Sequence, residues 1–391
     1  MISAVLHIVA DDAVVMAREA FEPLGRLTIR PSGGIRPADL ADADALVVRS
    51  GTHVDAALLE GTPVRFVGTA TSGTDHIDLD WLESRGITFA AAPGCNAQAV
   101  AEYVLAALLV VSRRLARPLK GPVLGVVGCG HVGGRVARIG RALGLQVLEC
   151  DPPLAEATGD ARFITLDELL ARADVVSLHV PLTKSGPWAT AGLFDAKTIS
   201  RIRNGAVFLN TARGGVTDDA ALAAARRDGR FAALVIDVWS AEPEVNPELL
   251  ATADLLTPHI AGYSIEGRIA GTRMIAESLA AWIGEHRWRV RPDLHAPPLP
   301  PELLATVQES AAAGVTALMA TVYDIMADAE RFRLAVSGRA AGDRSGSGIF
   351  RNFRREYPHR RELSSFVQAV SPVADAADWL SRFLSDVSAG P

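Results

Sequence analysis

The stretch Val123-Leu-Gly-Val-Val-Gly-Cys-Gly-His-Val-Gly133 decides how this chain folds. Its first half has the composition of a buried strand, and its second half places Gly128, Gly130 and Gly133 in the spacing G-x-G-x-x-G. A helical segment follows, and Asp151 ends the next apolar run 18 residues beyond Gly133. Strand, glycine turn, helix, strand and acid, in this order, predict a dinucleotide-binding unit of the Rossmann type.

The same loop predicts the cofactor. The backbone at the start of the helix, including His131 and Val132, would offer N–H groups to a pyrophosphate. The carboxylate of Asp151 can accept hydrogen bonds from the two ribose hydroxyls and would repel a 2′-phosphate, so the sequence favours NAD over NADP. The side chains of Cys129 and His131 are interpreted as bystanders.

Working outward, the region from 123 to 257 repeats the alternation of strand and helix. Helical patterns separate most of its strand-like runs, which predicts a six-stranded, doubly wound parallel sheet. The runs are Val123–Val127, Gln146–Cys150, Asp174–Leu178, Ala206–Asn210, Ala233–Asp237 and Asp254–Thr257.

The N-terminal region predicts a second doubly wound parallel sheet, of the flavodoxin type. Its strands are expected at Ala4–Val9, Ala45–Arg49, Val64–Gly68 and Ile87–Ala90, with helices at 12–21, 54–60 and 78–84. Long helices over 96–113 and 264–284 would connect it to the next domain. We therefore expect a substrate-binding domain from 1–95 and 264–288 and an NAD-binding domain from 96–263.

A proline-rich segment over 289–301 predicts a linker to a small, separate α/β domain that occupies 289–391. Helices are expected near 301–328 and 374–384, a strand over Ser364–Ser371, and a flexible segment over Gly342–Gly348. The chain length of 391 residues is sufficient for this number of domains.

Composition excludes several classes of partner. Lys and Arg number 39 against 45 for Asp and Glu, so there is no basic surplus of the kind that nucleic acids or anionic membranes require. The three cysteines form no C-x-x-C pair, which argues against a disulfide scaffold or a cysteine-based metal site. The longest wholly apolar run, Tyr103–Val111, is too short to span a bilayer. We expect a cytoplasmic protein without metal, nucleic acid or membrane partners.

Three polar side chains follow successive predicted strands of the second sheet. Arg213, Glu242 and His259 come after the fourth, fifth and sixth strands, and ligands of doubly wound sheets bind at these strand ends. His259 can accept a hydroxyl proton near neutral pH, and Glu242 can orient its ring and favour its protonated form. Arg213 offers a planar fork to a carboxylate. Together they predict oxidation of a 2-hydroxy acid.

Other polar residues are interpreted conservatively. His53, His76 and His179 lack metal-ligand spacing and are assigned structural or surface roles. Glu102, inside an apolar helix, is interpreted as a partly exposed helix charge. The basic run from Arg351 to Arg361 is interpreted as a solvated or subunit-contact face, with a phosphate contact as the alternative.

These stretches resemble one known family. The glycine fingerprint, Asn210-Thr-Ala-Arg213-Gly, Asp237-Val-Trp-Ser-Ala-Glu242-Pro and Thr257-Pro-His259-Ile-Ala-Gly are together similar to the D-isomer-specific 2-hydroxyacid dehydrogenases. Phe66-Val-Gly-Thr-Ala-Thr-Ser-Gly-Thr-Asp-His76, Ser185-Gly-Pro-Trp188 and His259-Ile-Ala-Gly-Tyr-Ser-Ile-Glu-Gly267 point to a branch of that family that acts on a phosphorylated 2-hydroxy acid.

The resemblance implies roles for individual residues. Arg213, Glu242 and His259 form the implied catalytic set, with His259 as the proton donor in the reductive direction. The implied NAD contacts outside the glycine loop are Asp151, Asp237 and Gly262, and the implied substrate contacts are Ser50, Thr71 and Tyr263. Val180 stands where relatives usually carry a threonine that contacts the cofactor, so only a backbone contact is expected there. The cleft is expected between the first two domains, and the C-terminal domain is expected to form a homodimer.

Two alternatives stay open on the sequence. The substrate could be another D-2-hydroxy acid, such as 3-phosphoglycerate or glyoxylate/hydroxypyruvate. The chain could also be a non-catalytic protein that binds and senses NAD(H), although such a protein has no chemical need for Arg213, Glu242 and His259 together.

Overall fold

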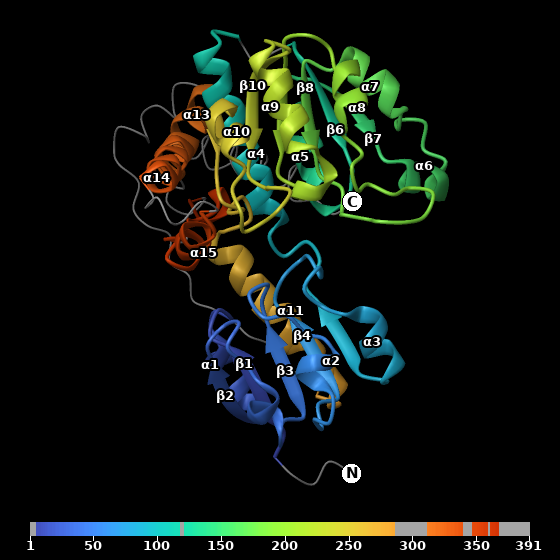
Figure 1. Cartoon of the computed structure of the whole chain (residues 1–391), viewed down its shortest axis with the longest axis vertical. Helices are drawn as coiled ribbons and strands as arrows, with labels where there is room; N and C mark the ends of the chain where they lie inside the picture. The colour runs from blue at the N-terminus through green and yellow to red at the C-terminus, as the bar shows by residue number, and fades with distance from the viewer. Residues whose placement is uncertain (1–4, 118–120, 286–310, 339–345, 359, 367–391) are drawn as a thin grey trace. The chain divides into compact units, whose positions relative to one another are not determined.

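The computed structural model describes residues 5–117, 121–285, 311–338, 346–358 and 360–366 (Figure 1). The chain divides into two compact units. The first consists of Met1–Asn96 with Ser264–Leu294, and the second of Ala97–Tyr263 with His295–Pro391. The C-terminal residues therefore cluster with the second unit. The separate domain from 289 onward stays a prediction.

The first unit is built on a five-stranded parallel sheet with the order β2-β1-β3-β4-β5. This is the flavodoxin-like doubly wound order that the sequence predicts. The strands are β1 (His7–Asp11), β2 (Arg26–Arg30), β3 (Ala45–Val48), β4 (Phe66–Thr69) and β5 (Thr88–Ala91). The α-helices are α1 (Ala17–Phe21), α2 (Ala56–Leu59), α3 (Leu79–Ser84) and α11 (Ile265–Trp282), with short 3-10 turns η1 (Glu22–Leu24) and η2 (Pro37–Leu40).

Helix α11 returns to the first unit and packs against its sheet. Ser264 caps the helix by accepting a hydrogen bond from the backbone N–H of Gly267 at 2.9 Å. Gly68 of β4 makes the close packing possible, because a β-carbon there would overlap the side chain of Ile275. The glycine and the helix cap explain why a segment 170 residues or more downstream of this sheet completes its core.

The second unit is built on a six-stranded parallel sheet with the order β11-β10-β9-β8-β6-β7. An isolated bridge from Glu149 to Phe163 adds one position beside β7, so the chain order is that of a Rossmann sheet. The strands are β6 (Val123–Val127), β7 (Gln146–Cys150), β8 (Val175–Leu178), β9 (Ala206–Asn210), β10 (Phe231–Ile236) and β11 (Leu255–Leu256). The six predicted strands and their parallel arrangement are confirmed.

Helices cover both faces of this sheet, so its strands are buried on both sides. Alternation along β6 shows the two faces: Leu124 and Val126 pack in one hydrophobic cluster and Val127 in the other. The helices are α4 (Ala97–Arg114), α5 (His131–Ala142), α6 (Pro152–Thr158), α7 (Leu166–Arg172), α8 (Ala196–Arg201), α9 (Asp219–Arg227) and α10 (Pro247–Thr252), with the 3-10 turn η3 (Gly214–Val216).

The described C-terminal elements are helical and pack on the second unit. They are α13 (Ala311–Val322), α14 (Ile325–Ser337), α15 (Ser347–Arg355) and the 3-10 turn η4 (Leu363–Phe366). Phe332 of α14 lies 6.1 Å from the ring of Trp239 and 5.5 Å from that of Phe353. This aromatic packing joins the C-terminal helices to the loop that follows β10.

Two C-terminal expectations are corrected. The strand expected from Ser364 is a 3-10 turn over its first residues, and the single helix expected over 301–328 is interrupted where Asp324 caps α14. The α/β character expected for this region is not seen among its described residues. The linker over 289–301, the helix over 374–384 and most of the glycine-rich segment lie outside the described residues.

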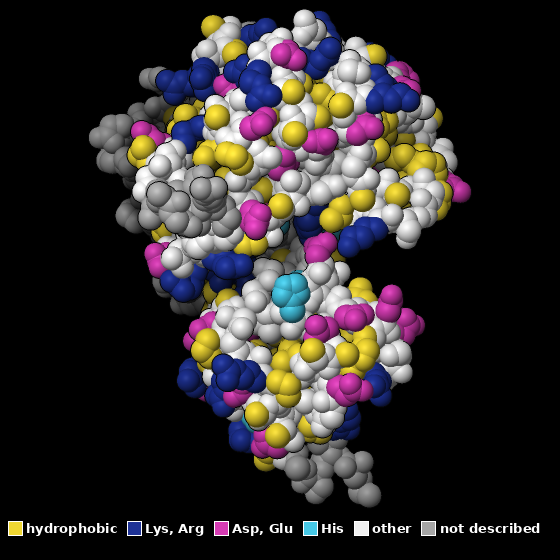
Figure 2. Space-filling model, in the orientation of Figure 1, with side chains coloured by type: hydrophobic (Ala, Val, Ile, Leu, Met, Phe, Trp, Pro, Cys, Tyr) yellow, Lys and Arg dark blue, Asp and Glu magenta, His cyan; other side chains and the backbone are white. Residues whose placement is uncertain are grey.

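The visible surface carries charges of both signs, interspersed with apolar and uncharged polar side chains (Figure 2). Within the described parts of the chain, no helix combines the length and the hydrophobicity that a membrane crossing needs. Nor do three or more His, Cys, Asp or Glu side chains of these residues gather as a metal site would require.

Candidate active site

The glycine loop between β6 and α5 has the shape of a pyrophosphate cradle. Gly128 has φ of +86°, and a β-carbon there would lie 2.7 Å from Cγ1 of Val180. A β-carbon at Gly133 would overlap the carbonyl of Gly128, whereas one at Gly130 would meet no atom within 4 Å. The first and third glycines therefore close the turn. The second leaves open space at the N-terminus of a 12-residue helix, where a dinucleotide places its phosphates.

Asp151 is held beside this loop at the end of β7. One carboxylate oxygen accepts the backbone N–H of Cys129 at 2.7 Å, and the other accepts that of Leu154 at 3.1 Å and caps α6. Each oxygen keeps a second acceptor position for a ribose hydroxyl. The residues present therefore fit NAD. Burial raises the pKa of the Cys150 thiol to about 11 and raises that of Cys129 further, so both thiols are unreactive.

The loop lies at the switch point of the sheet. Strands β6 and β8 are neighbours, yet the chain runs from β6 outward to β7 before it returns to β8. Ligands of such sheets bind where the strand order reverses, at the carboxyl ends of the strands. Val180 and His179, which follow β8, face Gly128 across this point.

His179 is not a proton carrier. Its Nε2 lies 2.9 Å from Oγ of Ser177, and its Nδ1 lies 3.5 Å from Oγ1 of Thr211. Burial lowers the pKa of His179 to about 3, so the ring is neutral at physiological pH. The structural role assigned to this histidine agrees with these contacts.

His259 and Glu242 form a pair at the ends of neighbouring strands. Nδ1 of His259 lies 2.7 Å from Oε2 of Glu242, and Oε1 of Glu242 accepts the backbone N–H of Trp239 at 2.9 Å. Burial acts to raise the pKa of Glu242, but the charge and hydrogen bond of His259 outweigh it, so the pKa is lowered. The histidine side chain is 30% exposed, which leaves its Nε2 reachable by a ligand.

Asp237 fixes the loop that carries His259. Its carboxylate accepts Oγ1 of Thr257 at 2.7 Å and the backbone N–H groups of Ile260 and Ala261 at 2.8 and 3.0 Å. Thr257 in turn pairs with the hydroxyl of Tyr103 at 2.6 Å. Burial raises the pKa of Asp237, which is fully buried. The structure gives Asp237 an anchoring role, and its cofactor contact stays a prediction.

Arg213 extends from the loop that follows β9. The buried side chain of Asn210 holds this loop by accepting the N–H of Ala212 at 3.0 Å and donating to the carbonyl of Arg213 at 3.1 Å. A β-carbon at Gly214 would overlap the carbonyl of Trp239, so the loops after β9 and β10 pack directly together. Arg213, Glu242 and His259 thus come from three neighbouring strands of one sheet.

Ser50 and Thr71 belong to the first unit. They follow the neighbouring strands β3 and β4, with Ser50 exposed and Thr71 half-buried. Oγ1 of Thr71 donates to the carbonyl of Gly73 at 2.8 Å. Sequence reasoning missed Asp11, a fully buried acid at the end of β1 that accepts the hydroxyls of Ser32 and Thr52 at 2.8 Å. The sequence signal that could have indicated Asp11 is its position at the end of a strand.

Sequence reasoning also missed a buried clamp from the C-terminal region. Arg360 donates to the carbonyls of Ile260, Tyr263 and Ala99 at 3.0, 3.3 and 2.7 Å, and to that of Ala261. The interpretation of the basic run as a solvated or subunit-contact face is therefore wrong for this arginine, whose side chain fastens the loop after His259.

Glu102 is corrected as well. It is 1% exposed, and its two oxygens accept the backbone N–H of Leu363 at 3.1 Å, while Gln98 donates a further bond. Burial and the nearby Glu362 carboxylate raise its pKa. The interpretation as a partly exposed charge is wrong, because the C-terminal segment covers this turn of α4.

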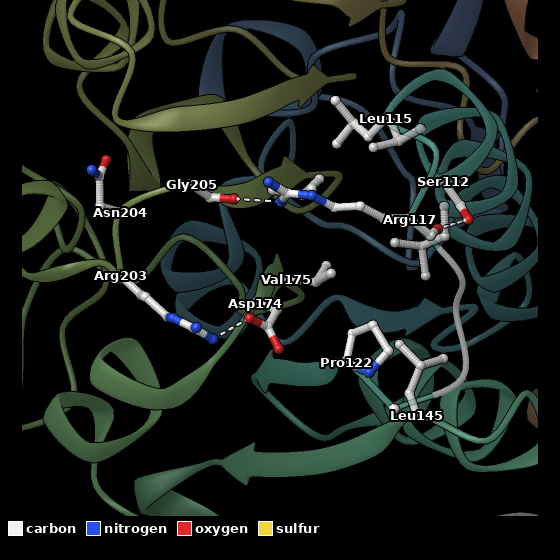
Figure 3. Close-up of a pocket in the computed structure, with 14 residues that line it drawn as sticks. Ser112, Leu115, Arg117, Pro122, Leu145, Asp174, Val175, Arg203, Asn204 and Gly205 are labelled. Carbon is white, nitrogen blue, oxygen red and sulfur yellow. Dashed lines mark hydrogen bonds and ion pairs between the residues drawn. The ribbon is translucent and has the colours of Figure 1, made fainter.

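The opposite edge of the sheet holds a pocket of about 400 Å³ that takes no part in this arrangement (Figure 3). It lies near the amino ends of β6, β8 and β9. Arg203 is paired with Asp174 there, and Arg117 donates to the carbonyl of Gly205 at 3.1 Å. Its labelled charged groups are thus satisfied within the protein.

The fold and the site define an NAD-dependent D-2-hydroxyacid dehydrogenase. Residues 106–261 match the family model of the D-isomer specific 2-hydroxyacid dehydrogenase NAD binding domain. The chain belongs to the erythronate-4-phosphate dehydrogenase family. The Escherichia coli member is 42% identical over 389 residues, covering 96% of this chain and 97% of its own. The Salinibacter ruber member is 50% identical over 289 residues, covering 72% of this chain and 74% of its own.

Solved structures show the same fold. The crystal structure of D-lactate dehydrogenase from Aquifex aeolicus, complexed with NAD and lactic acid, has a TM-score of 0.61 and 27% sequence identity. The match covers 96% of that chain but 71% of this one. More than a quarter of this chain therefore has no counterpart in that enzyme.

Proposed function

We propose that this chain oxidises 4-phospho-D-erythronate to (R)-3-hydroxy-2-oxo-4-phosphonooxybutanoate with NAD, a step in the biosynthesis of pyridoxal 5′-phosphate (vitamin B6). The observation that carries the proposal is the pair of His259 and Glu242, beside the Arg213 loop, in a chain related over nearly its whole length to erythronate-4-phosphate dehydrogenases.

The reaction removes a hydride from C2 of the substrate and a proton from the hydroxyl group on that carbon. NAD, when bound at the glycine loop, supplies the hydride acceptor. Because Glu242 occupies Nδ1 of His259, Nε2 is the atom that accepts the hydroxyl proton. The Glu242 carboxylate then stabilises the imidazolium, and Arg213 binds the substrate carboxylate through its guanidinium fork.

Further contacts are proposed by residue. Ser50, Thr71 and Tyr263 contact the substrate through their hydroxyls. Gly262 and Asp237 contact NAD, and Val180 does so through its backbone, because its side chain lacks a hydroxyl. The phosphorylated substrate and the reduced cysteines suit a cytoplasmic reaction.

The assay that tests the function offers purified protein 4-phospho-D-erythronate, with 3-phosphoglycerate and hydroxypyruvate as parallel substrates. A 2-oxo acid such as 2-oxoglutarate is included so that a tightly bound NADH can be reoxidised. We expect sustained turnover with the erythronate alone. Turnover with 3-phosphoglycerate alone would keep the mechanism and reject the substrate, and NADH binding without any turnover would favour a sensor.

Replacing His259 by Ala tests the proton acceptor. We expect kcat to fall by about 10³-fold, within the usual range for loss of a general base. NADH binding, followed by its fluorescence, should stay unchanged because the glycine loop is intact. His53→Ala, at an exposed histidine, is the control and should keep full activity. Normal turnover in His259→Ala would reject the assignment.

We also propose that the protein is a homodimer through its C-terminal region. Light scattering of the full chain should give twice the chain mass of 41.3 kDa. A mass of one chain at micromolar concentration would contradict this proposal.

A further inference from the structure

Arg354 of α15 lies beside Tyr263, at the end of the loop Thr257–Tyr263 that carries His259. We call this segment the catalytic loop. Its Nε donates to the hydroxyl of Tyr263 at 3.1 Å, and its guanidinium carbon lies 5.5 Å from the centre of the Tyr263 ring. Tyr263 is four residues after His259, and its N–H bonds the carbonyl of Ile260 at 2.9 Å. A helix of the C-terminal region therefore brings a cation to the loop that carries the proton acceptor.

The charge of Arg354 acts on the catalytic pair. It is one of the groups that lower the pKa of Glu242. Burial acts to lower the pKa of Arg354 itself, but Tyr263, Glu242 and Asp237 outweigh it, so the pKa is raised. The arginine is a permanent cation within electrostatic range of the site.

The Nη groups of Arg354 differ from those of three nearby C-terminal arginines, which all have partners. Arg331 pairs with Asp328, Arg355 with Glu356, and Arg360 with backbone carbonyls. Among the described residues, neither Nη group of Arg354 has a hydrogen-bond partner, and the side chain is half-buried. A guanidinium that keeps two donors open inside a site is suited to a bidentate oxyanion.

We propose that Arg354 binds the phosphate of the substrate and thereby sets the preference for a phosphorylated 2-hydroxy acid; this rests on the proposed function. A substrate with a carboxylate at C1 and a phosphate at C4 needs two separate cations. Arg213 follows β9 and Tyr263 follows β11, with β10 and Glu242 between them. The two strands are about 10 Å apart across the sheet, which suits a four-carbon chain that carries an anion at each end.

The comparison with D-lactate dehydrogenase supports this role. Lactic acid, the ligand of that enzyme, has a carboxylate but no phosphate. That chain matches over 96% of its own length and leaves more than a quarter of this chain unmatched.

The test compares Arg354→Gln and Arg354→Lys with wild type on 4-phospho-D-erythronate and on D-erythronate, which lacks the phosphate. Arg354→Gln should lower kcat/KM for the phosphorylated substrate by about 10- to 100-fold, mainly through KM, and should lower kcat/KM for D-erythronate much less, because only the first substrate loses its phosphate contact. Arg354→Lys should lose less. Arg355→Gln, at the exposed neighbouring arginine, is the matched control and should change neither value.

Equal losses on both substrates would overturn the proposal and make Arg354 a positioning residue for Tyr263 and Glu242. Equal activity of wild type and Arg354→Gln would overturn it too. If D-erythronate turns over too slowly to measure, competitive inhibition by inorganic phosphate is measured instead. Its inhibition constant should rise at least 10-fold in Arg354→Gln and stay constant in Arg355→Gln. NADH binding and thermal unfolding verify that each variant is folded.

A wrong substrate assignment can be told apart from a wrong role for Arg354. If the substrate assignment is wrong, wild type will be inactive on 4-phospho-D-erythronate but active on another acid. The Arg354 variants would be compared on the phosphorylated and unphosphorylated forms of that acid, with the same expected difference.

Discussion

Two histidines of the second unit lie in different environments, and the difference favours His259 over His179 as the proton acceptor that we propose. His179 and His259 both follow strands of the same sheet, but His179 is buried among hydroxyls and stays neutral, with its pKa lowered to about 3. His259 has a carboxylate at 2.7 Å on one nitrogen and leaves the other open. A carboxylate partner is what favours an imidazolium during turnover.

Glu242→Gln tests this pairing. The variant keeps the shape but removes the charge that stabilises the imidazolium, so kcat for oxidation should fall by about 10- to 100-fold. The loss should be present across the whole pH range in which wild type is active, because glutamine carries no charge at any pH. Glu244→Gln, at an exposed glutamate two residues away, serves as control. An unchanged kcat in Glu242→Gln would show that Glu242 does not act on His259.

At the same scale, the sequence allowed the pair to be predicted but not the C-terminal arginines. Glu242 and His259 follow strands, and strand ends of a parallel sheet share one edge, so their proximity could be reasoned. Arg354 and Arg360 contact a loop about 100 residues earlier. Nothing in a basic, aromatic run states which distant carbonyls or hydroxyls it will meet.

Among the elements, strands buried on both faces were the most predictable. The bounds of β6, β7 and β9 agree with the runs read from sequence, since continuous apolar stretches between turns leave little choice. Strand β2 was missed because Arg26-Leu-Thr-Ile-Arg30 begins and ends with arginine and lies at a sheet edge. The 3-10 turn at Leu363–Phe366 forms where Glu102 binds the chain, a contact invisible in local sequence.

Arg360→Met tests the C-terminal clamp on the catalytic loop. Four carbonyls would lose their donor, so the free energy of unfolding should fall by about 3 kcal/mol and kcat by about 10-fold. NADH affinity should fall less than kcat, because the glycine loop is anchored elsewhere and only the proposed Gly262 contact lies in the clamped loop. Arg351→Met, at an exposed arginine of α15, is the control. A normal kcat in Arg360→Met, measured below its melting temperature, would show that the loop holds its shape without the clamp.

The acid stability of the second unit should depend on Asp254, which joins α9 to the sheet. Arg226 donates to both its oxygens at 2.8 and 3.0 Å, and the N–H of Leu234 adds a third bond at 2.9 Å. Burial acts to raise the pKa of Asp254, but these bonds outweigh it and the pKa is lowered. The stabilisation is therefore complete above the unfolded value of 3.8 and is lost as pH falls through the lower folded value.

Asp254→Asn should reduce the free energy of unfolding by about 2 kcal/mol at pH 7, measured by urea denaturation. The gap to wild type should narrow below pH 4, where the unfolded wild-type chain takes up a proton at Asp254 that the folded chain binds only at lower pH. Asp228→Asn, an exposed neighbour on the same helix end, should show no gap at either pH. A gap that stays constant down to pH 3 would contradict the lowered pKa.

At the scale of the whole molecule, the chain leaves the first unit after Asn96 and returns to it at Ser264. The glycine loop, Asp151, Arg213, Glu242 and His259 all belong to the second unit, so the residues proposed for NAD binding and proton transfer lie within that unit. The C-terminal helices belong to it as well. Each residue that holds the catalytic loop in place, from Asp237 to Arg360, is supplied within the same unit.

The clamp also has a consequence for biosynthesis. Arg360 is made 100 residues after Ile260, whose carbonyl it binds. A ribosome thus completes the sheet, the glycine loop and the histidine pair before it adds the side chain that fastens them. A polypeptide cut short by a premature stop codon or by a protease ahead of Arg360 would contain every group of the hydride-transfer chemistry with its loop unfastened. Full catalytic activity is therefore expected only after translation has reached the C-terminal region.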